Sequence, residues 1–141
     1  KTTMYDGGVR VPFMLRWPAM VKPGVSDAFV CQMDLLASFA GLLGQTYPDK
    51  LDSRNTLKAF LGKSKKGREE LVIEGMFNYA YRKGDWALIP PYRKQTEYQL
   101  YNLKEDIGQK HNLADKYPKK VKELTDEFEA LKLSTGKKTR F

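Results

Sequence analysis

The hydrophobic and polar positions of the chain follow two different periods, and the first of them is helical. Across residues 33–43 the apolar positions repeat at i, i+3, i+4 and i+7, which places on one helix face Leu36, Phe39, Ala40 and Leu43. Gly44 follows, where helices commonly end on a left-handed residue. Other leucines lie off this stripe, so the pattern predicts a helix that is apolar on nearly all sides and needs cover on more than one flank.

Shorter elements are predicted on either side of this helix. Residues 9–17 read VRVPFMLRW, which is rich enough in β-branched and aromatic side chains for a strand. Pro12 restricts that strand to a start, an edge or a bulge. After the helix and a polar loop, a short second helix is predicted around residues 56–61.

Past residue 70 the period becomes that of strands. The stretch LVIEGMFNYAYRKGDWALIPPY contains three apolar runs, and its RKGD segment predicts a hairpin turn in which Gly84 takes a positive φ. EYQLYNL predicts a further strand. A helix is predicted for residues 118–133, because one apolar stripe runs along an otherwise charged segment.

The change of period suggests two parts. The basic, glycine-containing residues 62–69 read as a connector between them. Residues 1–60 would hold one strand and a buried helix that is too hydrophobic to stand alone. Residues 61–141 would form an α+β unit, a roughly four-stranded antiparallel sheet packed by a C-terminal helix.

Composition and charge narrow the class of protein. With 41% hydrophobic and 30% charged residues, the chain is typical of soluble globular proteins, and no apolar run is long enough for a membrane span. The net charge of +8 favours polyanionic partners but does not distinguish nucleic acid, sulfated sugars and anionic lipid. Cys31 is the single cysteine, so an intrachain disulfide is excluded.

Residue patterns alone reveal little chemistry. His111 has no companion at metal-ligand spacing and is expected to be solvated or satisfied in its turn. Aromatic and basic residues interleave in FNYAYRKGDW and PYRKQTEYQLY, which suits stacking on sugars or bases but is more typical of a sheet with one solvated face.

Six segments nevertheless resemble, in order, those of one family. The opening KTTMYDGGVRVP is similar to the pattern K-x-x-x-Y-[ED]-G-G-x-R-x-P of the formylglycine-dependent sulfatases, in the alkaline phosphatase superfamily. RWP with VKPGVSD, MDLLASFAGLLG, LDSRN, YRKGDWALI and LYNLKEDIGQKHNLADKYP resemble later family segments. Ala37 and Ile107 stand where the family usually has proline. The chain resembles the C-terminal part of such a sulfatase.

The resemblance implies an α/β parent of alkaline-phosphatase-like fold. Residues 1–60 would be the C-terminal end of its catalytic domain, and residues 61–141 its smaller C-terminal subdomain. The parent would hydrolyse sulfate esters on a sulfated small molecule or glycan rather than act on nucleic acid, and would be periplasmic, secreted or lysosomal. Its formylglycine nucleophile and its calcium ligands would lie in a missing N-terminal catalytic domain, so this stretch alone is expected to be inactive.

The resemblance also assigns site residues. Lys1 occupies the position of the family lysine that reaches the sulfate group, where an ammonium stabilises the charge that develops as the S–O bond breaks. Arg10 is expected to be structural, paired with a carboxylate near the site. Residues expected near a polyanionic substrate are Arg82, Lys83, Trp86, Tyr92 and Arg93.

Two other functions stay open at this point. A phosphonate or phosphate monoester hydrolase of the same superfamily would share much of this architecture. A free-standing polyanion-binding module without catalysis would equally explain the basic charge.

Overall fold

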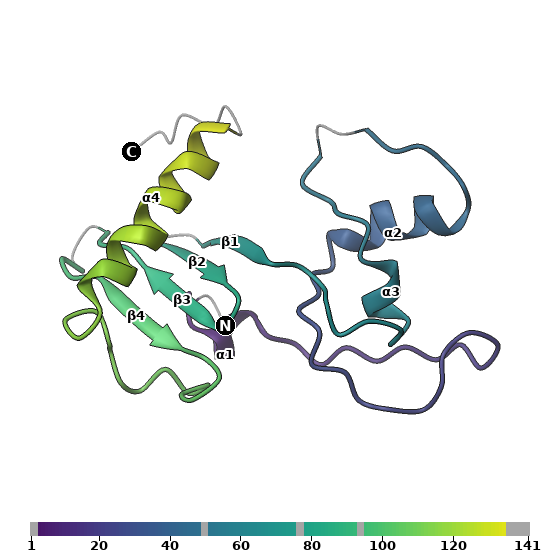
Figure 1. Ribbon diagram of the computed structural model, residues 1–141, viewed down its shortest axis with the longest axis horizontal. Helices are drawn as coiled ribbons and strands as arrows, with labels where there is room; N and C mark the ends of the chain where they lie inside the picture. Colours follow the sequence, from purple (N-terminus) through teal and green to yellow (C-terminus); the bar gives the residue numbers. More distant parts are fainter. Residues whose placement is uncertain (1–2, 49–50, 76–77, 93–94, 135–141) are drawn as a thin grey trace. The chain divides into compact units, whose positions relative to one another are not determined.

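The computed structural model describes residues 3–48, 51–75, 78–92 and 95–134. The chain forms two compact units (Figure 1), which we name the sheet unit, residues 1–11 with 70–141, and the two-helix unit, residues 12–69. Among the described residues, no helix combines the length and the apolar character needed to cross a membrane. The predicted division at residue 60 concerns a longer protein and stays a prediction.

The sheet unit is built on four antiparallel strands in the order β1-β2-β3-β4. Their bounds are β1 Glu70–Glu74, β2 Tyr79–Lys83, β3 Trp86–Ile89 and β4 Gln99–Asn102. The β2–β3 turn contains Gly84 at φ 55°, a backbone conformation that glycine adopts at no steric cost. The predicted sheet and hairpin are therefore confirmed.

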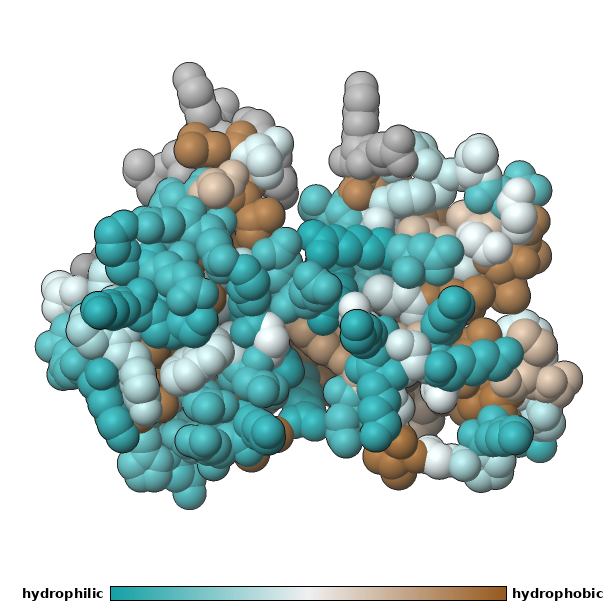
Figure 2. All heavy atoms as spheres, in the orientation of Figure 1, coloured by the Kyte–Doolittle hydropathy of each residue, from teal (hydrophilic) through white to brown (hydrophobic). Residues whose placement is uncertain are grey.

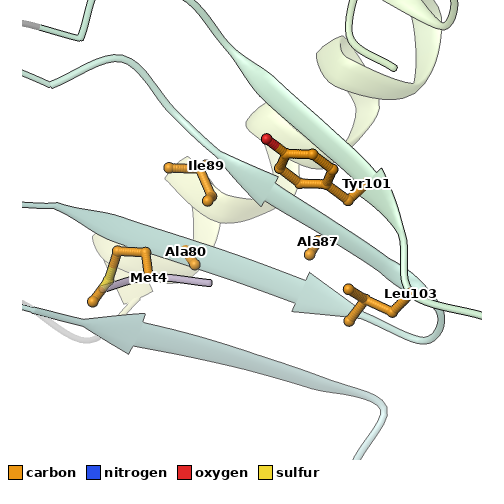
Figure 3. Packing of buried hydrophobic residues seen from close by; sticks show 6 residues of the cluster. All are labelled: Met4, Ala80, Ala87, Ile89, Tyr101 and Leu103. Carbon is orange, nitrogen blue, oxygen red and sulfur yellow. The ribbon is translucent and has the colours of Figure 1, made fainter. Parts of the chain in front are cut away.

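Helix α4, Pro118–Ser134, covers one face of this sheet (Figure 1), which we call the helix face. Leu124 and Phe128 of α4 are 1% and 2% exposed and pack against Tyr81, Leu88 and Leu100 of the sheet. Alternate residues of the strands point to the opposite face. There a second cluster gathers Met4, Ala80, Ala87, Ile89, Tyr101 and Leu103 (Figure 3), and we call this the N-terminal face.

The two-helix unit holds α2, Asp34–Leu42, and α3, Leu57–Phe60, as the helical spacings predict. Gly44 has φ 64°, and the Gln45 N–H donates to the Ala40 carbonyl at 2.8 Å. This 6→1 bond is that of a Schellman motif, so the predicted C-terminus of α2 is confirmed.

The predicted strand at residues 9–17 is wrong. A four-residue helix, α1 Asp6–Val9, occupies its beginning, and residues 10–17 have no regular structure. A strand needs a hydrogen-bonded neighbour, and within the described residues none pairs with this segment; Pro12 also lacks an N–H. Met14 is 91% exposed, so no burial fixes an alternating pattern here.

Helix α2 packs with its small and polar side. Asp34, Ala37 and Ser38 are buried. The apolar stripe is largely exposed, at 57% for Leu36, 51% for Phe39 and 71% for Leu43. Figure 2 shows hydrophobic side chains, in brown, on the surface of the two-helix unit, in the right half of the view.

A buried ion pair explains this orientation of α2. The Asp34 side chain is fully buried, and the Arg68 guanidinium donates to both of its carboxylate oxygens, at 2.8 and 2.9 Å. The Arg54 N–H donates to the same carboxylate at 2.8 Å. Ser38 and Ser53 accept further backbone N–H groups. These bonds join α2 to the segments on either side of α3.

Replacing the charge at the centre of this network tests it. Asp34→Asn leaves Arg68 buried without its counter-charge, so we expect the local stability of α2 to fall by about 3–5 kcal/mol. Amide hydrogen exchange across α2 measures the loss. The exposed Asp27 supplies the control Asp27→Asn, expected within about 0.5 kcal/mol of wild type. Equal exchange in both variants would contradict the role given to Asp34.

The exposed stripe predicts self-association of the 141-residue chain when it is made alone, since large exposed apolar patches promote association. Replacing Leu36, Phe39 and Leu43 together by glutamine should shift the population toward monomer in light scattering. Leu133→Gln is the control, because Leu133 is 82% exposed on α4. A monodisperse wild-type monomer over a wide concentration range would contradict the prediction.

Candidate functional site

Lys1, the predicted sulfate contact, lies outside the described residues, but the segment that follows it is well anchored. Met4 is 8% exposed and lies in the cluster on the N-terminal face of the sheet (Figure 3). Met4 lies three positions after Lys1 in the sequence. The backbone at Met4 is therefore held on this face by apolar packing.

Tyr5 adds polar contacts to the same face. Its hydroxyl donates to Gln99 Oε1 at 2.8 Å, and the Tyr101 hydroxyl donates to the same oxygen at 3.1 Å. The two rings meet edge to face with centroids 6.1 Å apart. Burial is the main cause that raises the pKa of Tyr101 to about 12, so this phenol remains a neutral donor at neutral pH.

Asp6 is the most connected residue of the segment. It is 8% exposed, and its backbone N–H donates to Gln109 Oε1. The Arg82 guanidinium donates to its carboxylate at 3.4 Å, and Arg10 lies 3.7 Å from the other carboxylate oxygen. Burial lowers the pKa of Arg82 while Asp6 opposes that shift, and an arginine stays charged throughout the working range. The predicted pairing of Arg10 with a carboxylate is confirmed.

Gln109 approaches Asp6 from a tight turn. It has φ 50°, unusual for a residue other than glycine, and it is 8% exposed. The Asp106 carboxylate fixes this turn by accepting the N–H groups of Lys110 and His111, each at 2.8 Å. These bonds lower the pKa of Asp106. His111 is itself mainly exposed, with Nδ1 3.5 Å from Asp106, as predicted for a histidine satisfied in its turn.

The double glycine lets the segment fold back on itself. A Cβ atom at Gly8 would lie 2.5 Å from the Thr3 carbonyl oxygen, whereas one at Gly7 would meet nothing within 4 Å. An open hollow of about 390 Å³ lies beside this turn, lined by Thr3, Tyr5, Gly7, Gly8, Ile107, Gly108 and Gln109. The close approach of this segment to Thr3 therefore requires a glycine at position 8 but not at position 7.

The other predicted site residues do not gather at one place. Arg82 points to the N-terminal face, toward Asp6. Lys83 and Trp86 belong to the helix face, where Lys83 donates to Glu127 of α4 and Trp86 packs edge to face on Tyr117 at 5.6 Å. Tyr92 forms an isolated bridge with Gln95. Arg93 lies outside the described residues.

Sequence reasoning missed two residues that anchor the N-terminal segment: Gln109, which binds Asp6, and Gln99, which binds Tyr5. Gln109 lies inside the family-like segment LYNLKEDIGQKHNLADKYP and Gln99 directly precedes it, but neither amide carries a chemical signature of its own. Their contacts with Asp6 and Tyr5 join positions 103 and 94 residues apart. Only the folded sheet brings such distant positions together.

The described residues show no metal centre. Among them, no three histidine, cysteine, aspartate or glutamate side chains gather closely enough to hold an ion. The buried carboxylates of Asp6 and Asp34 are instead neutralised by arginines. The arrangement is that of an anchored N-terminal segment, with its polar groups paired within the chain.

Comparison with known proteins identifies the family. Residues 1–134 match the family model described as N-sulphoglucosamine sulphohydrolase, C-terminal, so the chain belongs to this family of C-terminal sulfatase domains. It is 37% identical, over 94% of its length and 29% of the relative, to an N-acetylgalactosamine-6-O-sulfatase of Bacteroides thetaiotaomicron. It is 38% identical to human arylsulfatase A over 52% of this chain and 15% of that protein.

Solved structures agree with this assignment. One from a study of glycosaminoglycan metabolism by Bacteroides thetaiotaomicron matches with a TM-score of 0.86 and 36% identity, over 94% of this chain and 31% of that one. Another, a complex with its substrate D-glucosamine-2-N,6-O-disulfate, matches with a TM-score of 0.68 and 24% identity, over 88% and 28%, and supports the fold alone. The predicted sulfatase resemblance is confirmed, and the chain spans less than a third of the first relatives' length.

The two glycines offer a matched test of the anchored segment. Gly8→Ala places a methyl group against the Thr3 backbone, so we expect faster amide exchange at Gly8 and Arg10, whose N–H groups bond to Tyr5 and Asp6. Gly7→Ala has open space and should leave the segment intact or stabilise it by about 0.5–1 kcal/mol. Equal exchange in the two variants would contradict the close approach at Gly8.

Proposed function

We propose that this chain is the C-terminal part of a longer enzyme that hydrolyses sulfate esters on a sulfated glycan or small molecule. The observation that carries the proposal is the 37% identity to an N-acetylgalactosamine-6-O-sulfatase across 94% of this chain. The family match begins at Lys1 and so includes the lysine and the Tyr5–Gly8 turn. In this proposal residues 1–60 complete the catalytic domain, and residues 61–141 form its C-terminal subdomain.

Lys1 is the proposed catalytic contribution of the chain. Hydrolysis of a sulfate ester increases the negative charge on the leaving and non-bridging oxygens as the S–O bond breaks. A fixed ammonium beside these oxygens stabilises that charge more in the transition state than in the ground state, which is the condition for raising the rate.

Substrate contacts of Arg82, Lys83, Trp86, Tyr92 and Arg93 remain proposals. The two faces of the sheet limit them, because Arg82 lies on the N-terminal face while Lys83 and Trp86 lie on the helix face. A substrate that lies along one face can therefore use only one of these two sets.

Other catalytic groups are proposed to lie upstream of Lys1. The described residues do not fit a calcium site, since their buried carboxylates are already paired with arginines. We place the calcium ligands and the formylglycine nucleophile in the N-terminal part of the longer protein. A periplasmic, secreted or lysosomal location is proposed on family resemblance.

The proposed function is tested by assaying the longer protein on matched esters. With 6-O-sulfated and 6-O-phosphorylated N-acetylgalactosamine as probes, we expect sulfate release to exceed phosphate release. Faster phosphate release would favour the monoester hydrolase of the same superfamily. Binding of sulfated glycans without turnover of either ester would favour the non-catalytic polyanion-binding module.

Removing the ammonium tests the role of Lys1. In the longer protein, Lys1→Ala should lower kcat/KM for the sulfate ester by about 10²- to 10³-fold, the typical effect of losing one transition-state donor. Lys104→Ala, which removes an exposed charge from the turn after β4, should leave kcat/KM unchanged. Comparable rates for Lys1→Ala and Lys104→Ala would exclude Lys1 from the site.

A further inference from the structure

The contacts of Arg82 suggest a role different from substrate binding. Arg82 pairs in register with Ala87 on the adjacent strand, and it lies on the N-terminal face. Its side chain is only 24% exposed, and its guanidinium donates to the buried Asp6 carboxylate at 3.4 Å. Nε of the same group lies 3.4 Å from the Gly84 carbonyl of the hairpin turn. The guanidinium is thus directed into the chain.

Asp6 is held from two sides by distant parts of the chain. Arg82 holds its carboxylate from the hairpin, and Gln109 accepts its backbone N–H from the turn after β4. The sequence separations are 76 and 103 residues. Together these two bonds fix both the side chain and the backbone of Asp6 relative to the sheet.

Fixing this segment restricts Lys1 through the covalent chain. Met4 lies three positions after Lys1, so their Cα atoms are at most about 11 Å apart. Met4 is itself buried in the cluster on the N-terminal face. If residues 4–6 came loose, the volume open to the Lys1 ammonium would grow, and misplacement of a catalytic group by about 1 Å can cost about 100-fold in rate.

We propose that Arg82 is a positioning residue, which acts through Asp6 to hold the backbone from which Lys1 reaches the sulfate group. This inference rests on the proposed function, because it gives Arg82 a role in the reaction only if Lys1 contacts sulfate. It differs from direct substrate binding, in which Arg82 would contribute independently of Lys1. It also differs from a purely structural role, in which loss of Arg82 would lower the amount of folded protein without changing kcat per folded molecule.

A double-mutant cycle in the longer protein separates these roles. With Lys1 present, Arg82→Ala should lower kcat for the sulfate ester by about 10- to 100-fold with little change in KM. In the Lys1→Ala background the same substitution should lower kcat less than about threefold, because the group that it positions is gone. Asp6→Asn should reproduce the pattern, and Asp6→Asn with Arg82→Ala should be no worse than either alone.

Control measurements separate the positioning effect from a change in charge and from a loss of folded protein. Lys122→Ala removes one positive charge from α4, where its side chain is 77% exposed, and should leave kcat unchanged. Rates are normalised to the folded fraction from thermal unfolding. If Arg82→Ala does not fold, Arg82→Lys replaces it, since a lysine keeps the charge but not the forked geometry of the guanidinium. Amide exchange at residues 4–10 should be faster in each Arg82 or Asp6 variant.

Several results would overturn the inference. Equal losses of kcat from Arg82→Ala in the two Lys1 backgrounds would show direct action of Arg82 on the substrate. Unchanged kcat per folded molecule, or unchanged exchange at residues 4–10, would leave Arg82 without a positioning role. If the wild-type protein does not hydrolyse sulfate esters, the proposed function and this inference both fail. If it does, but the losses of kcat from Arg82→Ala and Lys1→Ala add in the double variant, only this inference fails.

Discussion

The two-helix unit depends on one interaction, the buried ion pair between Asp34 and Arg68. Its apolar core is small, built largely on Ala37, Ala59, Phe60 and Leu61, and much of its chain lacks regular structure. A fully buried carboxylate is costly unless its oxygens are satisfied, so the arrangement in which Arg68 and the Arg54 N–H meet Asp34 is strongly preferred over alternatives. That requirement turns the polar side of α2 inward and leaves its leucine and phenylalanine stripe outward.

Buried polar groups must find partners in the sheet unit as well, but there the requirement bears mainly on one of the two faces of the sheet. The helix face is closed mainly by apolar packing of α4, and Glu127 of α4 also accepts hydrogen bonds from Tyr81 and Lys83 of the sheet. The N-terminal face is mixed: Met4 contributes hydrophobic burial, while Tyr5 and Asp6 are held by Gln99, Arg82 and Gln109. Hydrophobic contact alone would let this short segment slide, because it is not directional. The hydrogen bonds and the ion pair define the register of this segment on the sheet, which is what the role proposed for Lys1 requires.

Features that depend on residues close together in the sequence could be predicted from it, and features that depend on distant partners could not. The C-terminus of α2 at Gly44, the hairpin at Gly84 and the extent of α4 depend on neighbouring residues, and the sequence predicts each of them. The strand at residues 9–17 and the inward side of α2 depend on partners elsewhere, and there local pattern misleads. Arg82 illustrates the same limit within the site, since a basic residue beside aromatic ones suggests ligand binding, but its partner is Asp6, 76 residues away.

The same pairings bear on which side chains of the described residues can transfer a proton in the proposed reaction. A general base needs a lone pair that is free to accept a proton within reach of the substrate. The carboxylates of Asp6 and Asp34 are buried, and each accepts a hydrogen bond from an arginine side chain of the same unit. The Asp106 carboxylate accepts two backbone N–H groups, and His111 is mostly exposed beside it. These three carboxylates are thus engaged in local structure. Under the proposed function, we therefore place the proton-transfer groups elsewhere in the longer protein, and the anchored residues 4–6 support the proposed role of Lys1.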